Sequence, residues 1–109
     1  MPEEKKDDPS LEKKDDNSVY IGNSAKINYI TASMYIIQKN RFVSLKARGR
    51  AINAAVDVAE ILKNKFVTDA QYSEIRLNTE QRPNPDGRTS NVSSIEIDLI
   101  IPKKEENPQ

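Results

Sequence analysis

The chain has 109 residues, which is enough for one folded domain with tails and too few for two domains. It contains neither cysteine nor histidine, which excludes disulfides, thiol catalysis, Cys/His zinc sites and imidazole acid–base chemistry. No apolar run approaches the roughly 20 residues that span a bilayer, and the charged N-terminus is unlike a signal peptide. We therefore expect a soluble, intracellular protein with no membrane contact, no metal site and no cofactor.

The formal net charge is zero, but the charges are unevenly distributed along the chain. Residues 1–17 carry seven acids against four lysines, and residues 18–101 carry eleven basic residues against eight acids. No Asp or Glu lies between Asp16 and Asp57, an interval with six basic residues: Lys26, Lys39, Arg41, Lys46, Arg48 and Arg50. This cationic interval predicts an anionic partner.

Composition divides the chain into a domain and two tails. Residues 1–17 hold eleven charged residues and two prolines, so they have too little apolar surface to offset the entropy lost on ordering. We expect a disordered acidic tail there. Its role is either to keep the protein soluble or to compete weakly with nucleic acid for the cationic interval. A folded domain is predicted over residues 18–101 and a disordered tail over residues 102–109.

A short strand and a helix open the predicted domain. Residues 19–21 are apolar and end at Gly22, and Asn23 and Ser24 are favoured N-cap types for a helix over residues 26–38. Apolar residues recur along this helix at three- and four-residue steps and predict a core stripe: Ile27, Ile30, Met34 and Ile37. The opposite side is uncharged, which fits a surface near another chain or a ligand: Asn28, Thr31, Ser33 and Tyr35.

The next strand leads through a basic corner into a second helix. Residues 42–47 alternate as a strand whose predicted inward side chains are Val43, Leu45 and Ala47. Lys46, Arg48 and Arg50 would then point outward, and Gly49 permits a backbone turn that a β-carbon would hinder. These cations and the positive end of the helix dipole suit an anionic polymer, although three solvated surface charges would give the same pattern.

The second helix, predicted over residues 51–66, has a wide apolar arc. Two adjacent lines of apolar side chains form it: Ile52, Ala55, Ala59, Leu62 and Phe66, and beside them Ala51, Ala54, Val58 and Ile61. A helix packed only on its own sheet should leave about half of its surface polar. Part of this helix is therefore expected to meet a partner subunit.

Two further strands complete the predicted domain. Residues 72–79 alternate with Ile75 and Leu77 inward. Residues 92–101 place Glu96 and Asp98 on one face and four apolar side chains on the other: Ile95, Ile97, Leu99 and Ile101. The order β-α-β-α-β-β predicts an α/β domain of the two-layer α+β type, with a four-stranded mixed sheet and both helices on one face.

The segment between the last two strands is predicted to form an extended hairpin arm. Residues 81–90 contain a Pro-Asp-Gly turn signal, flanked by Arg82 and Arg88. Arginines on such an arm suit entry into a DNA minor groove. An ordinary surface loop with two solvated arginines is the alternative.

Four blocks together resemble the Alba family of archaeal chromatin proteins over residues 18–101. They are Val19-Tyr20-Ile21-Gly22 with Asn28-Tyr29, Lys46 to Ile52 with Ala55-Val56-Asp57, Lys65-Phe66, and Asp86-Gly87-Arg88 with Val92 to Ile97. The resemblance implies a dimer that coats, compacts or bridges double-stranded DNA, largely without sequence specificity, and that also binds RNA.

The resemblance also implies roles for particular residues. Contacts to the phosphate backbone are implied at the basic corner and the first turn of its helix: Lys46, Arg48, Arg50 and Asn53. Arg82 and Arg88 would belong to the arm that enters a minor groove. Phe66 would lie at a contact between neighbouring dimers.

One departure from the family concerns the loop after the first strand. Many members have two lysines there, whereas this chain has Asn23-Ser24, with Lys26 further on. Two phosphate contacts would therefore be weakened to hydrogen bonds from Asn23 and Ser24 or moved to Lys26. Each missing cation should flatten the logarithmic salt dependence of binding by about 0.9, and affinity at low salt should fall. Control by acetylation at that loop cannot be carried over to this chain.

Alternatives to this interpretation stay open. The partner could be mainly RNA, within a ribonucleoprotein, and the dimer could pair this chain with itself or with a paralogue. A purely structural oligomerisation module would also explain the wide apolar arc. An enzyme is not expected, because the carboxylates are scattered without a base to activate them. The resemblance implies a cytoplasmic protein associated with the chromosome or nucleoid.

Overall fold

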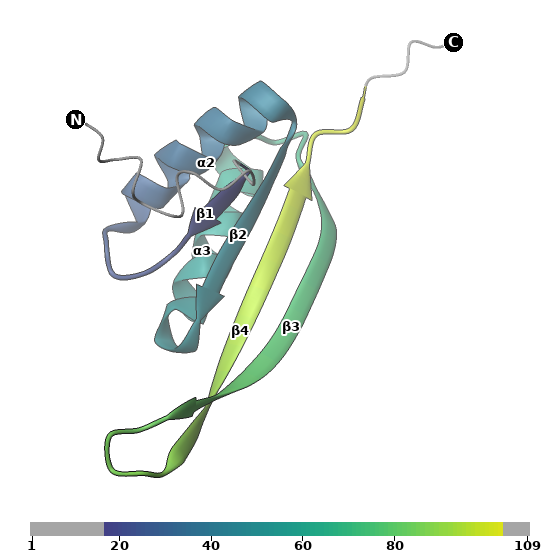
Figure 1. Ribbon diagram of the computed structural model, residues 1–109. Helices are drawn as coiled ribbons and strands as arrows, with labels where there is room; N and C mark the ends of the chain where they lie inside the picture. The colour runs from purple at the N-terminus through teal and green to yellow at the C-terminus, as the bar shows by residue number, and fades with distance from the viewer. Residues whose placement is uncertain (1–16, 104–109) are drawn as a thin grey trace, which may run out of the picture.

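The structure is a computed structural model that describes residues 17–103 (Figure 1). Its strands are β1 (Ser18–Tyr20), β2 (Phe42–Arg48), β3 (Gln71–Pro83) and β4 (Thr89–Ile100). Its helices are α2 (Lys26–Asn40) and α3 (Ile52–Ile61), and α3 is preceded by a 3-10 turn (Gly49–Ala51) and continued by a π-helical turn (Leu62–Phe66). The predicted tail over residues 1–17 lies outside the described part except for its last residue, as does the end of the C-terminal tail from residue 104.

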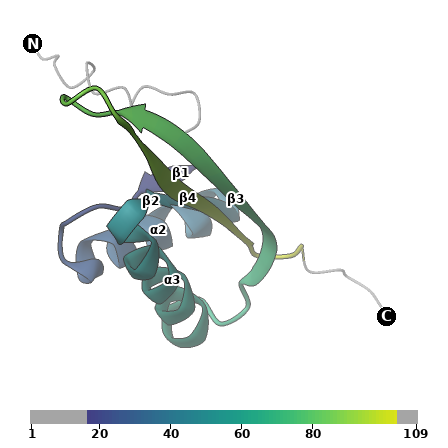
Figure 2. The ribbon, with the colours of Figure 1, turned by 90° about the horizontal axis from the view of Figure 1, so that it is seen from below.

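The four strands form one mixed sheet in the order β1-β2-β4-β3. β1 runs parallel to β2, whereas β4 is antiparallel to both β2 and β3. Figures 1 and 2 show both helices on the same face of this sheet, with the other face open. The predicted fold class, a two-layer domain with a β3-β4 hairpin, is confirmed.

The core lies between the sheet and the two helices. β2 and β4 supply alternating buried side chains, as predicted: Val43, Leu45 and Ala47 from β2, and Ile95, Ile97 and Leu99 from β4. The helices meet them with Ile30, Ile37, Ala55, Val58, Ala59 and Leu62. Because Lys46 and Arg48 alternate with the buried residues of β2, burial of that strand directs both cations to the open face.

Three expectations for α2 are wrong. Ile27 is 56% exposed, because the first turn of α2 lies beside the loop from β1 rather than over the sheet (Figure 1). Ser33, placed by sequence on the polar side, is fully buried between Ile30 and Ile37. The helix is preceded by an extended Ala25 without a side-chain cap, so neither Asn23 nor Ser24 acts as the predicted N-cap.

β3 also differs from its prediction. Ile75 and Leu77 face the helix side of the sheet but are 52% and 75% exposed, because the helices pack over β2 and β4 and leave most of this edge strand uncovered. The hydroxyl of Tyr72 donates to the carboxylate of Glu60 and ties the start of β3 to α3. Burial and this hydrogen bond raise the pKa of Tyr72.

Within residues 17–103, no helix is long and apolar enough to cross a membrane.

Candidate nucleic-acid interface

The basic corner is a sharp change of backbone direction between β2 and α3. Arg48 is still extended, with φ −140° and ψ 155°. Gly49 then takes a left-handed φ of 59°, which side chains other than glycine adopt at a cost. The following 3-10 turn leads directly into α3, whose first turn contains no acidic residue. The amide groups and positive dipole end of the helix are therefore not neutralised by an acid of the first turn.

The corner's cations differ in their neighbours. Lys46 Nζ lies 3.9 Å from Glu96 Oε2, and the Lys46 side chain is 23% exposed. Arg48 is half-exposed and meets Glu80 Oε1 at 3.6 Å. Arg50 is exposed on the 3-10 turn and, among the described residues, takes part in no ion pair within 4.0 Å. The interval has no acid in sequence, but carboxylates of β3 and β4 lie beside two of its cations in the fold.

Not all cations of the acid-free interval belong to this corner. Arg41 ends α2 with a left-handed φ of 64°, and its backbone N–H donates to Ile37 at 2.7 Å. Its guanidinium donates to the carbonyl of Pro102 at 3.0 Å. Lys39 lies over the ring of Tyr35, at 5.5 Å from the centroid. Both cations lie at the end of α2 remote from the basic corner, as Figure 1 shows.

The loop between β1 and α2 is organised by a tyrosine. The hydroxyl of Tyr29 accepts the backbone N–H groups of Gly22 and Ser24, each at 2.9 Å. Hydrogen bonding to the Ser24 side chain, and then to these backbone groups, lowers the pKa of Tyr29. Asn23 and Ser24 are exposed at this loop, and Lys26 pairs with Asp57 of α3 at 2.9 Å.

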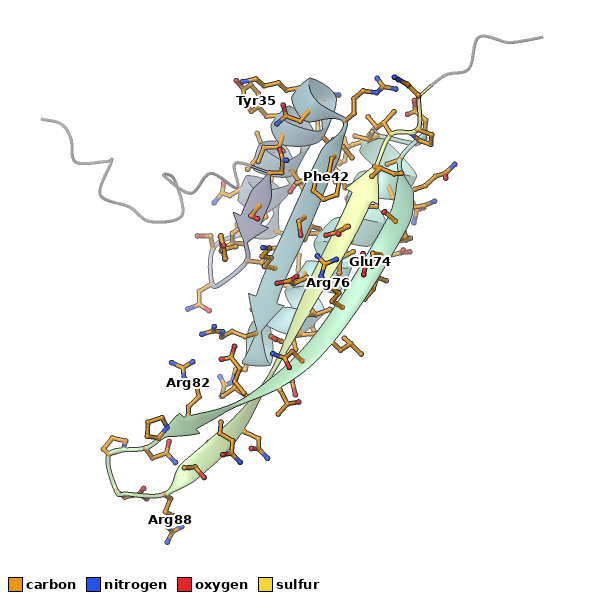
Figure 3. All side chains as sticks on the ribbon, turned by 45° about the vertical axis from the view of Figure 1, so that its right-hand side comes forward. Tyr35, Phe42, Glu74, Arg76, Arg82 and Arg88 are labelled. Carbon is orange, nitrogen blue, oxygen red and sulfur yellow. The ribbon has the colours of Figure 1, made fainter. Side chains whose placement is uncertain are left out.

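The hairpin is a paired ribbon almost to its tip. Its strands remain in register to the pair Pro83–Thr89, so residues 81–90 are less loop-like than predicted. The turn closes with an N–H of Asn84 donating to Arg88 at 2.7 Å and a positive φ at Gly87. Figure 3 shows Arg82 and Arg88 projecting from this end of the molecule. Arg88 is highly exposed and meets Asp86 at 3.8 Å.

An ion-pair network on the open face escaped prediction from the sequence. Arg76 donates to Asp98 through two nitrogens at 2.9 and 3.0 Å, and to Glu96 at 2.7 Å. Glu74 approaches the same guanidinium at 3.1 Å (Figure 3). Hydrogen bonds to Asp98 and Glu96 raise the pKa of Arg76. The two β4 carboxylates are thus paired with the guanidinium of one β3 residue.

The elements that carry the predicted contacts lie at one end of the molecule. Figure 1 shows the β1-α2 loop, the β2-α3 corner and the hairpin together at the lower end of the sheet. The π-helical turn with Phe66 lies at the opposite end of α3, and Phe66 is 47% exposed. Asn53 is exposed in the first turn of α3, beside the corner.

Similarity to known proteins identifies the family of this chain. The sequence profile of the Alba family matches residues 17–79, which includes β1, α2, the basic corner, α3 and most of β3.

The chain belongs to the Alba family.

Its relatives within the Alba family are similar over most of their length. DNA/RNA-binding protein Alba 1 of Archaeoglobus fulgidus is 46% identical over 90 residues, which cover 82% of this chain and 98% of the relative. DNA/RNA-binding protein Alba of Methanocella arvoryzae is 40% identical over 90 residues, 82% and 94% of the two chains. These names describe binding proteins, in agreement with the expectation that the chain is not an enzyme.

Solved Alba structures share the fold. Alba from Thermoplasma volcanium superimposes with a TM-score of 0.71 at 46% identity, covering 77% of this chain and 99% of that one. ALBA1 from Trypanosoma brucei gives a TM-score of 0.63 at 25% identity, with coverage of 78% and 68%. The family resemblance inferred from the four sequence blocks is confirmed.

Proposed function

We propose that this Alba-family chain binds double-stranded DNA with little sequence preference, and RNA as well. The observation that carries the proposal is the gathering of the basic corner, the β1-α2 loop and the arginine-bearing hairpin at one end of the molecule. The names of its relatives, DNA/RNA-binding proteins, support the same class of partner.

The corner is suited to the phosphate backbone. Arg48 and Arg50 are exposed at the junction between β2 and α3, where two guanidinium groups and the positive end of the helix dipole favour anions. Lys46 adds positive charge behind them, and Asn53 adds an amide from the first helical turn. Such contacts do not depend on base sequence, which is why binding should tolerate different duplexes.

The remaining predicted contacts are of two kinds. Arg82 and Arg88 lie on a two-stranded ribbon narrow enough to follow a groove, and guanidinium groups favour the negative potential of a narrow minor groove. Asn23 and Ser24 supply hydrogen bonds rather than charge, and Lys26 is already paired with Asp57. The loop therefore contributes less to affinity than the corner does.

A dimer is proposed because apolar side chains remain uncovered on the helix side of the sheet. Ile75, Leu77 and, on α3, Val56 are all more than 40% exposed. Covering them with the same surface of a second copy would remove apolar area from water, at about 25 cal/mol per Å². The partner is this chain itself or a paralogue with a similar surface, and the pair would present two arms to one duplex.

Phe66 supports a further level of assembly in this proposal. Its half-exposed ring lies at the end of the molecule remote from the hairpin, where it would meet a neighbouring dimer on the same or another duplex. Dimers linked in this way would coat, compact or bridge DNA. The protein would then act in the cytoplasm, on the chromosome or nucleoid.

Fluorescence anisotropy with two duplexes of unrelated sequence, each at a low and a high salt concentration, tests this function. We expect similar affinities for both duplexes and a steep fall in affinity with salt, because binding releases counterions. Affinity for one sequence only, or affinity independent of salt, would contradict the proposal. A competition experiment tests the mainly RNA-directed alternative. That alternative is favoured if a structured RNA displaces the labelled duplex at lower concentrations than unlabelled duplex does.

A further inference from the structure

A hollow opens on the face of the sheet that the helices leave free. Its volume is about 440 Å³, and all four strands contribute to it. Tyr20 comes from β1, Lys46 and Arg48 from β2, Glu96 from β4 and Glu80 from β3. The hollow adjoins the basic corner, because Lys46 and Arg48, proposed above as phosphate contacts, also line it.

One wall of the hollow is an aromatic ring suited to stacking. Tyr20 follows buried Val19 and precedes buried Ile21, so its side chain is directed to the open face and is 52% exposed. Lys46 Nζ lies 5.8 Å from the ring centroid, in cation–π range. An exposed ring whose orientation is supported by a cation is a stacking platform for an unpaired base.

The other side of the hollow is rich in hydrogen-bond acceptors. Both oxygens of Glu96 are engaged, one by Arg76 at 2.7 Å and the other by Lys46 at 3.9 Å. Glu80 meets Arg48 only at 3.6 Å, beyond hydrogen-bond length, so its carboxylate keeps acceptor capacity. The Watson–Crick edge of guanine has two adjacent N–H donors that match a carboxylate, whereas uracil has one donor between two acceptors.

We propose that this hollow is a subsite for an unpaired guanine of single-stranded nucleic acid, stacked on Tyr20 and hydrogen-bonded to Glu80. Lys46 and Arg48 hold the neighbouring phosphates. The inference rests on the proposed function, because these two cations also serve duplex binding. It adds base preference on single strands, which phosphate contacts alone do not give.

The test compares a labelled twelve-nucleotide uridine tract with the same tract containing three guanosines, and a duplex, by fluorescence anisotropy. Wild-type protein should bind the guanosine tract about tenfold more tightly, the order of discrimination that one bidentate hydrogen-bonded base contact gives. Tyr20→Leu should abolish this preference, and Tyr20→Phe should retain it because the ring remains. Circular dichroism before and after heating checks that both variants are folded.

Tyr35 offers a matched control. It is also an exposed tyrosine beside a lysine, but it lies at the far end of α2, away from the sheet's open face (Figure 3). Tyr35→Leu should leave the guanosine preference unchanged. Equal losses in Tyr20→Leu and Tyr35→Leu, or no preference in the wild-type protein, would overturn the inference.

Glu80→Gln separates the hydrogen bond from general electrostatics. Removing the negative charge should strengthen binding to the uridine tract, while loss of the carboxylate should reduce the guanosine preference severalfold. A uniform increase for both tracts would contradict the assigned role of Glu80. Wild-type protein that binds the duplex without preferring guanosine defeats this inference alone, whereas failure to bind any of the three probes defeats the proposed function too.

Discussion

Arg48 and Arg50 are neighbours in sequence with different electrostatic surroundings. Arg48 lies 3.6 Å from Glu80, whereas no carboxylate of the described residues pairs with Arg50. A phosphate that binds Arg48 must compete with a carboxylate already present. Exposed pairs of this kind are worth about 0–1 kcal/mol, so the competition weakens DNA binding without preventing it.

Glu80→Gln should therefore raise the affinity for duplex DNA about two- to fivefold, the equivalent of one exposed ion pair. Glu74→Gln is the matched control, because it also removes one negative charge from β3. Glu74 pairs with Arg76 and lies outside the basic corner. Duplex titrations at one salt concentration measure both variants. An equal gain in the two would show that only net charge matters and that Glu80 has no local effect.

At the scale of single elements, α2 carries an unusual buried group. Ser33 is fully buried, and its hydroxyl has no hydrogen-bond partner among the described residues. Leaving a buried hydroxyl unpaired costs about 1–3 kcal/mol, and alanine is also the better helix former. A single substitution that removes this hydroxyl should therefore increase the free energy of unfolding.

Ser33→Ala should increase the free energy of unfolding by about 1 kcal/mol, since the removed hydroxyl stabilises nothing and the void it leaves is small. Urea unfolding followed by circular dichroism measures the change. A decrease of more than about 1 kcal/mol would mean that the hydroxyl is bonded in solution, contrary to the structure.

The elements were predictable where one local pattern decided the outcome. Period-two alternation along β2 and β4 correctly identified their buried faces, since both strands lie beneath helices. The same alternation failed for Ile75 and Leu77, because no local signal shows that β3 is an edge strand beyond the helices. Ser33 was misplaced because a small polar residue looks solvent-facing even when it closes a helix–sheet contact.

The candidate site was predictable in its cations but not in their partners. Lys46, Arg48 and Arg50 follow from strand alternation and one glycine. Their proximity to Glu80 and Glu96 depends on pairing between strands that are far apart in sequence, as in the register pair Lys46–Glu96. Tyr20 was missed as a candidate stacking residue because it looks like part of a buried apolar strand until the open face is known.

At the scale of the whole molecule, the exposed apolar side of β3 should determine the oligomeric state. Ile75→Glu would place a charge in the proposed dimer surface and should convert the dimer to monomers at micromolar concentration. Ile27→Glu is the matched control, because Ile27 is similarly exposed, 56% against 52%, but lies on the first turn of α2. Sedimentation equilibrium distinguishes the two variants.

A wild-type protein that sediments as a monomer would refute the dimer. Dissociation by both substitutions would show that the contact surface is not confined to β3 and extends over α2.

The basic corner is proposed to bind the phosphate backbone, and the salt dependence of duplex binding by Arg48→Ala/Arg50→Ala tests this role most directly. Each lost phosphate contact should reduce the logarithmic salt slope by about 0.9, so losing both should reduce it by about 1.8. Affinity at low salt should fall strongly while the thermal unfolding curve stays unchanged. Lys39→Ala/Lys65→Ala removes the same charge from the opposite end of the molecule. We expect a flatter slope for the arginine variant only; equal slopes for wild type and the arginine variant would contradict the proposed role.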